Sequence, residues 1–213
     1  MPRSAQTKVA RAIVRRLRRI SGKRVRFEVA GKPRAWNRHL NWRRRTEIDA
    51  SGNRVRRTGH GWEPDTIYRV YNPKSRSDYV YMTDRYGRVT RAEGQLVLNP
   101  AYRHTGQQRM AGGEARRSGD EGGHLFGTQF GGAGEGINVL PQSARLNSQG
   151  QREWWRMEQS WADELRAGNQ VHVKIVPKYR DDGDRPAWFK VTYTITRPNG
   201  TTETITRVFN NTI

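Results

Sequence analysis

Apolar residues first recur with a helical spacing near the N-terminus. Val9, Ile13, Leu17 and Ile20 are separated by four, four and three positions, which places them on one face of a helix. Arginines occupy most of the remaining positions between residues 9 and 20. The pattern predicts a short amphipathic helix, whose partner would be phosphates, an anionic membrane or another protein.

The most regular helical pattern lies between residues 151 and 167. Trp154, Met157, Trp161 and Leu165 form an apolar stripe at spacings of three, four and four, and a glycine follows the stripe. Because Trp154 and Trp161 fall on this stripe, we expect them to be core residues rather than platforms on which nucleic-acid bases stack.

Runs rich in Ile, Val, Thr and Tyr predict strands in the rest of the chain. The expected strands cover residues 66–71, 79–83, 95–98, 171–175, 191–195 and 201–209. Residues 22–61 and 106–123 show no clear period and are rich in Gly and polar residues, so we expect loops there.

The order of strands, loop, helix and strands predicts an α+β domain over residues 62–213. An arm over residues 1–61, with the short amphipathic helix, would precede it. Lys and Arg number 40 against 20 Asp and Glu, a formal charge of +20, and residues 1–60 alone hold 19 basic and 3 acidic residues. A polyanion is the natural partner of such an arm, although a solvated tail would have the same composition.

The composition also restricts the chemistry. Cysteine is absent, so a metal would have to sit on oxygen or imidazole ligands, which suits Mg²⁺ or Mn²⁺. No run approaches the roughly 18 apolar residues of a membrane-spanning helix. The first apolar cluster is interrupted by arginines, unlike a secretory signal peptide.

A set of small motifs between residues 120 and 158 carries the candidate chemistry. In order along the chain they are Asp120-Glu121-Gly122-Gly123-His124-Leu125, Phe130-Gly131-Gly132, Asn138-Val139-Leu140-Pro141-Gln142, Asn147, and Trp154-Trp155-Arg156-Met157-Glu158. This ordered set resembles the DNA/RNA non-specific endonuclease family, whose fold is the ββα-metal or His-Me finger fold. Within that family it looks most like the bacterial toxin branch.

The resemblance implies roles for individual residues. His124 would be the general base and Asn147 the direct metal ligand. Glu158 would lie close by and hold a water molecule bound to the metal ion. Asn138 and Gln142 would support the site or contact the substrate. The implied cofactor is Mg²⁺ or Mn²⁺, and the implied product carries a 5′-phosphate and a 3′-hydroxyl.

Elementary chemistry agrees with these roles. A histidine with a pKa of roughly 6.5 is neutral at neutral pH and can take a proton from the attacking water. An asparagine carbonyl is a hard oxygen ligand suited to Mg²⁺. Asp120 could act in catalysis or only brace the loop through local hydrogen bonds, and both roles stay open.

The sequence departs from the family pattern at Glu121, where the better-known branch has an arginine, and by one additional glycine before His124. Arg116, Arg117 and Arg145 are the candidates to bind the substrate phosphate in its place. The interval between Asn147 and Glu158 is also longer than in that branch.

Three hypotheses on function follow. The first is a metal-dependent nuclease acting on DNA and/or RNA, secreted or delivered into a target cell as a toxin or a fragment of one, with a secretion apparatus and a cognate immunity protein as partners. The second is a non-catalytic nucleic-acid-binding protein, and in the third the arm binds a membrane or a secretion partner instead of nucleic acid. A pure binder needs neither His124 nor Asn147, so their joint presence favours the nuclease.

Overall fold

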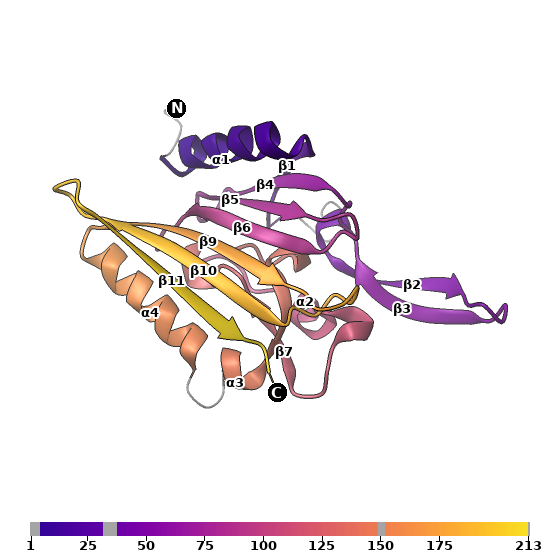
Figure 1. The fold of residues 1–213 in the computed structure, drawn as a ribbon. Helices are drawn as coiled ribbons and strands as arrows, with labels where there is room; N and C mark the ends of the chain where they lie inside the picture. Colours follow the sequence, from indigo (N-terminus) through magenta and orange to yellow (C-terminus); the bar gives the residue numbers. More distant parts are fainter. Residues whose placement is uncertain (1–4, 32–37, 149–151, 213) are drawn as a thin grey trace.

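A seven-stranded sheet forms the centre of the protein. The computed structural model describes residues 5–31, 38–148 and 152–212, and its main sheet has the strand order β1-β4-β5-β6-β9-β10-β11 (Figure 1). Only β1 and β4 pair in parallel; the other neighbours are antiparallel. The fold is therefore α+β, as predicted. The strands are β1 (Arg24–Val29), β4 (Thr66–Asn72), β5 (Ser77–Thr83), β6 (Val89–Gln95), β9 (Gln170–Lys178), β10 (Trp188–Thr196) and β11 (Thr202–Asn210).

The predicted C-terminal helix is α4 (Glu153–Arg166), which packs on the meander β9–β10–β11. Trp154 meets Phe189 and Phe209 at ring-centroid distances of 5.4 Å, and Trp161 meets Tyr193 at 5.6 Å. Both tryptophans are almost fully buried, which confirms their prediction as core residues. The stripe of α4 and the alternating apolar residues of β9 and β10 thus bury each other.

The predicted N-terminal helix is α1 (Ala5–Ser21), and its partner is the sheet itself. Ala10, Ile13 and Leu17 form a separate apolar cluster with Ile67 of β4 and Val80 of β5. The neighbours of Val80 on β5, two tyrosines, belong to the main core, so β5 is covered on both faces. The apolar stripe of α1 is therefore buried within the chain, and its arginine-rich side faces outward.

Residues 22–61, which were expected to form a loop, contain three strands, and this expectation was wrong. β1 extends the main sheet, while β2 (Trp42–Ile48) and β3 (Arg54–His60) form a separate antiparallel ribbon. We call residues 42–60 the arginine ribbon; Figure 1 shows it extending away from the rest of the chain. Its strands carry arginine on both sides, so no apolar alternation marks them in the sequence. The division of the chain into an arm over residues 1–61 and a domain over residues 62–213 stays a prediction.

Two further expectations are corrected. The strand expected at residues 95–98 lies instead at Val89–Gln95. It was not recognised in the sequence because a charged residue, Glu93, occupies one of its buried positions. There the carboxylate of Glu93 is bound by Arg16, Arg91 and His172. The expected loop 106–123 contains α2 (Thr105–Met110), a turn of 3₁₀ helix at Gly113–Ala115, and the start of a strand.

That strand begins the element that carries the candidate site. β7 (Asp120–His124) pairs antiparallel with β8 (Val139–Ser143), and α3 (Ala144–Asn147) and α4 follow. Behind it, Phe126 stacks on Tyr79 of the main sheet with ring centroids 4.0 Å apart. The strand–strand–helix order is that of a ββα-metal fold. None of the helices in the described part of the chain has the length and the apolar character of a membrane-spanning helix.

Candidate active site

A cleft of about 270 Å³ lies between the β7–β8 finger and α4, and three of the predicted site residues line it. His124 comes from the end of β7, Asn147 from the end of α3, and Glu158 from the second turn of α4. Residues that lie 34 positions apart in the sequence thus converge on one hollow. Its complete lining is Arg103, Gln108, Gly122, His124, Gly127, Thr128, Gln129, Asn147, Trp154, Trp155, Glu158 and Gln159.

His124 is held neutral in the cleft. Its side chain is only 7% exposed, and burial, followed by the nearby charge of Arg103, lowers its pKa to about 4. Its Nε2 atom is buried and has no hydrogen-bond partner among the residues that the structure describes. A buried polar atom without a partner is costly, so this nitrogen is available to a water molecule or a substrate atom.

Asn147 is oriented by Glu121. The Nδ2 atom of Asn147 donates a hydrogen bond of 2.6 Å to Oε2 of Glu121, while Ser148 donates one of 2.6 Å to Oε1. A carboxylate only accepts hydrogen bonds, so the end of the amide that faces Glu121 must be its nitrogen. The amide oxygen is thereby left as the end that can serve as a ligand in the cleft.

Glu158 is the carboxylate of the cleft. Burial raises its pKa to about 8, against the opposing effects of the Gly127 amide and Arg103. Gly127 lies so close that a Cβ atom there would be 2.5 Å from Oε1 of Glu158. A carboxylate that burial disfavours is stabilised by a nearby cation, so this position suits a metal ion.

The donor set fits a hydrated divalent ion. Asn147 offers an amide oxygen and Glu158 a carboxylate, and no group of three or more His, Asp or Glu side chains is placed to hold a metal within residues 5–31, 38–148 and 152–212. An ion held by so few protein ligands must keep several waters, which is the usual behaviour of Mg²⁺.

Asp120 lies at the other end of β7 and does not line the cleft. Its carboxylate binds Arg185 through two hydrogen bonds of 2.8 Å and also accepts the backbone N–H of Arg117 at 2.9 Å. Asp120 and Arg185 are both buried. Of the two roles left open for Asp120, the geometry supports bracing, because the ion pair ties the start of β7 to the segment before β10.

Asn138 and Gln142 are fully buried behind the cleft. Asn138 accepts hydrogen bonds from the Phe126 backbone and the Tyr81 hydroxyl, and it donates to the carbonyls of Phe126 and Ala133. It therefore holds the turn that follows His124. Gln142 packs beside Gly123, and both of its amide atoms are buried without a partner among the described residues. Neither lines the cleft, so the geometry supports a scaffold role.

The three arginines proposed to bind phosphate all lie outside the cleft. Arg116 donates to the backbone carbonyls of Gln108 and Ala111 and thus fastens α2, Arg117 is exposed elsewhere, and Arg145 borders a different hollow. The arginine that does line the cleft is Arg103. It precedes His124 by 21 positions and lies outside every motif, so nothing in the sequence marked it.

Trp155 was also missed as a site residue. It follows a buried tryptophan in the sequence, but it is 47% exposed and lines the cleft, together with the side chains of Gln108, Gln129 and Gln159. An exposed indole at the edge of a cleft is a surface on which a planar ring such as a nucleobase can stack. The aromatic pair in the sequence was a usable signal, since Trp154 falls on the apolar stripe of the helix and Trp155 falls beside it.

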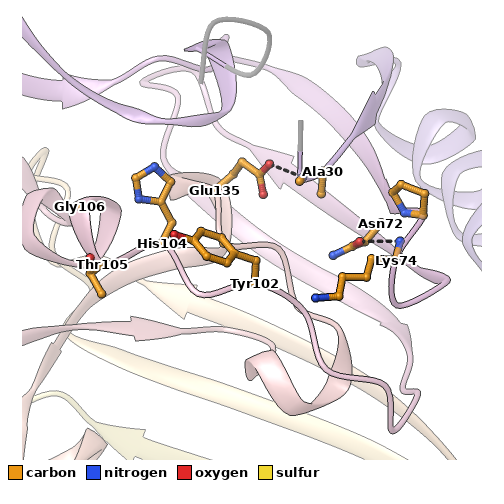
Figure 2. Close-up of a pocket in the computed structure, with 11 residues that line it drawn as sticks. Ala30, Asn72, Lys74, Tyr102, His104, Thr105, Gly106 and Glu135 are labelled. Atoms are coloured by element: carbon orange, nitrogen blue, oxygen red, sulfur yellow. Dashed lines mark hydrogen bonds between the residues drawn. The ribbon is translucent and has the colours of Figure 1, made fainter. Parts of the chain in front are cut away.

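A larger hollow of about 470 Å³ is lined by Tyr102 and His104, the two chain neighbours of Arg103 (Figure 2). Lys74, Tyr102, His104 and Glu135 line it, and Glu135 accepts the backbone N–H of Gly31 at 2.7 Å. It contains none of the predicted site residues. The smaller cleft is the candidate active site despite its size, because it combines an available imidazole, an oriented amide oxygen and a carboxylate.

Comparisons with known proteins find relatives in sequence and in structure. The Type VII secretion system protein EssD of Staphylococcus aureus, in strains USA300 and NCTC 8325, is 35% identical over 121 residues, which is 55% of this chain and 20% of EssD. The chain thus matches about a fifth of the length of these relatives. An extracellular nuclease of known structure matches with a TM-score of 0.43 and 19% identity, and the match covers 61% of this chain and 81% of the nuclease chain. The structure of Sda1 nuclease with bound zinc ion has a TM-score of 0.44 and 14% identity, covering 84% and 93%.

The family assignment rests on a match over most of the chain. The sequence model described as DNA/RNA non-specific endonuclease matches residues 64–197. This span runs from β4 to β10 and includes every residue that lines the cleft. Nucleases of this family depend on a divalent metal ion. The chain belongs to the DNA/RNA non-specific endonuclease family and is a hydrolytic endonuclease.

Proposed function

We propose that the protein cleaves phosphodiester bonds of DNA and/or RNA with little sequence preference, with His124 as the general base and Asn147 and Glu158 as the holders of a Mg²⁺ or Mn²⁺ ion. The observation that carries the proposal is the convergence of these three side chains on one cleft. The non-catalytic alternative gains no support from this geometry, since binding alone does not require a buried imidazole with an unpartnered nitrogen.

In the proposed reaction a water molecule attacks the phosphorus atom, and Nε2 of His124 accepts a proton from this water as the new bond from oxygen to phosphorus forms. The bond from phosphorus to the 3′ oxygen breaks, and this oxygen takes a proton from solvent water, which gives a 3′-hydroxyl and a 5′-phosphate. The neutral state of His124 makes its nitrogen an acceptor at physiological pH. The bound ion would supply positive charge opposite the phosphate and the leaving oxygen.

Arg103 takes the place of the arginine that the motif lacks. It is the arginine that lines the cleft, and its charge acts on both His124 and Glu158. A guanidinium binds phosphate oxygens in a bidentate manner and stabilises charge that develops on them. Glu121, which occupies the position of the missing arginine, serves instead to orient Asn147.

Incubation of the purified chain with plasmid DNA and with total RNA tests the function directly. Cleavage should require added Mg²⁺ or Mn²⁺, and EDTA should abolish it, because the ion neutralises charge that no protein side chain can replace. Undiminished cleavage in excess EDTA would contradict the metal role. Retention of both substrates uncut under every metal condition would favour the binding protein.

We further propose that the chain is a secreted or delivered toxin domain, alone or as a fragment of a longer toxin. Support comes from the likeness to EssD, whose name refers to a Type VII secretion system. A producing cell would then need an immunity protein, for which an acidic surface would complement this basic chain. Expression in a bacterial cytoplasm should arrest growth, while the His124→Ala chain should be tolerated; equal growth of both would contradict the toxin role.

A further inference from the structure

The arginine ribbon presents two different faces. Residues directly opposite each other in an antiparallel pair share a face, so the register places Arg44, Arg54 and Arg56 together, with Thr46, Ile48 and Thr58. We call this the open face. Its three arginines are exposed, and none of them has an ion pair within the described part of the chain.

The other face is partly neutralised. Arg57 lies 3.8 Å from the carboxylate of Glu47, and Arg45 donates a hydrogen bond of 3.0 Å to the carbonyl of His60. The second face holds Arg43, Arg45 and Arg57 against one acid, Glu47, whereas the open face holds three arginines and no acid, so the open face carries the larger net positive charge. Along a strand, residues on one face repeat about every 6.8 Å, and seven residues span about 24 Å.

The root of the ribbon is fixed to the finger that carries His124. Trp42 is buried, and its indole N–H donates a 2.9 Å hydrogen bond to the carbonyl of Val139, the residue paired with His124. Its backbone N–H and carbonyl are both bound by the side chain of Gln107 in α2. These contacts make the ribbon a rigid extension of the site.

The ribbon and α2 also enclose a hollow of about 570 Å³ at the root. Residues 42–45, which include Arg44 of the open face and Arg43 and Arg45 of the other face, line it from the ribbon, while Gln107 and Met110 line it from α2. The next residue of α2, Gln108, lines the catalytic cleft. A polyanion that lies on the ribbon and enters this hollow is thus led along α2 towards the cleft.

From this arrangement we infer that the arginine ribbon grips double-helical DNA by its major groove and so makes B-form DNA the preferred double-stranded substrate. This inference rests on the proposed nuclease function and adds the class of substrate. The major groove of B-form DNA is about 12 Å wide and admits a two-stranded β-ribbon. The major groove of A-form RNA is too narrow and deep for side chains to enter.

The arginines suit the phosphates at the edges of this groove. Guanidinium groups bind phosphate oxygens with fixed geometry, and contacts to the backbone carry no sequence information. Cleavage without sequence preference follows from such contacts. Thr46 and Thr58, which lie on the open face between the arginines, can also donate hydrogen bonds to phosphate oxygens.

Binding to short DNA and RNA duplexes of the same sequence tests the inference, in a His124→Ala background that leaves the duplexes intact. We expect Arg44→Ala/Arg54→Ala/Arg56→Ala to weaken DNA binding and flatten its salt dependence. Each lost phosphate contact lowers the salt slope by about 0.9, so the loss of affinity between about 50 and 200 mM salt should be about 40-fold smaller. RNA duplex should bind more weakly and change little.

A matched control removes the same charge from another surface. Arg15→Ala/Arg18→Ala/Arg19→Ala strips three exposed arginines from the outer side of α1, and it should leave DNA binding much closer to the wild type. Equal losses in the two triple variants would show a general charge effect and overturn the inference. Equal affinity of the ribbon for RNA duplex would overturn the groove docking.

A second readout separates this inference from the proposed function. With His124 present, the ribbon variant should hydrolyse bis(p-nitrophenyl) phosphate at the wild-type rate, because this diester is too small to reach the ribbon. If the wild type fails on this diester and on DNA while DNA binding still depends on the ribbon, only the proposed function fails. Unchanged DNA binding by the ribbon variant would reject the inference and leave an acidic protein as the ribbon's partner.

Discussion

Replacing His124 by alanine is expected to slow cleavage of plasmid DNA by about 10²-fold or more, the usual contribution of a general base. The imidazole is the group of the cleft that is neutral and has a free nitrogen, so no neighbouring side chain can take over the proton. Initial rates at saturating Mg²⁺ measure the effect, and circular dichroism verifies that the variant is folded.

Imidazole in solution distinguishes a lost base from a lost scaffold. Added imidazole should restore part of the rate of His124→Ala, because the substitution leaves a space beside the scissile bond with the size and shape of an imidazole ring. The variant Arg103→Ala, which changes a neighbour in the same cleft, should lose activity without any such rescue. A His124→Ala protein that stays within about tenfold of the wild-type rate would remove the assignment of the base.

The second large effect is expected at Asn147. Asn147→Ala removes the amide oxygen from the cleft, and we expect at least a tenfold rise in the Mn²⁺ or Mg²⁺ concentration that gives half-maximal cleavage. Calorimetric titration of Mn²⁺ in the absence of nucleic acid measures the same loss independently of turnover. Unchanged metal affinity in this variant would show that the ion is held elsewhere.

Glu121 should act through Asn147. Glu121→Ala frees the amide to rotate, so metal affinity or activity should fall by about 10- to 100-fold, with recovery of the rate at high metal concentration. Ser148→Ala removes the other hydrogen bond to Glu121 without touching Asn147, and should behave like the wild type. A loss of equal size in Ser148→Ala would mean that the whole turn, rather than the amide, depends on these contacts.

Periodicity identified the elements whose one face is apolar. The stripe of α4, the apolar side of α1 and the alternation in β9 and β10 were all visible, because each packs a continuous apolar face against a partner. The arginine ribbon was invisible for the opposite reason. Its strands are joined by backbone hydrogen bonds, and arginines on both faces leave neither face with a continuous apolar row.

The candidate site was predictable as far as its motif extends. The segment 120–158 pointed to the residues that meet in the cleft. Contacts that depend on distant parts of the chain were not accessible: Arg103 reaches the cleft from another loop, and Asp120 meets an arginine 65 positions away. In the sequence Glu121 is only a departure from the family pattern, and its contact with Asn147 is visible only in the hydrogen bond between them.

The close approach of Gly127 to Glu158 means that a substitution at position 127 can displace the carboxylate of Glu158. A methyl group at position 127 would stand 2.5 Å from Oε1 of Glu158, and the side chain can swing aside at little cost because its carboxyl end is flexible. An alanine there would leave His124, Asn147 and Arg103 in place while displacing the carboxylate of Glu158 from its position in the cleft. Such a stalled protein would allow intact nucleic acid to be trapped on the enzyme for crystallography with every side chain of the reaction still present.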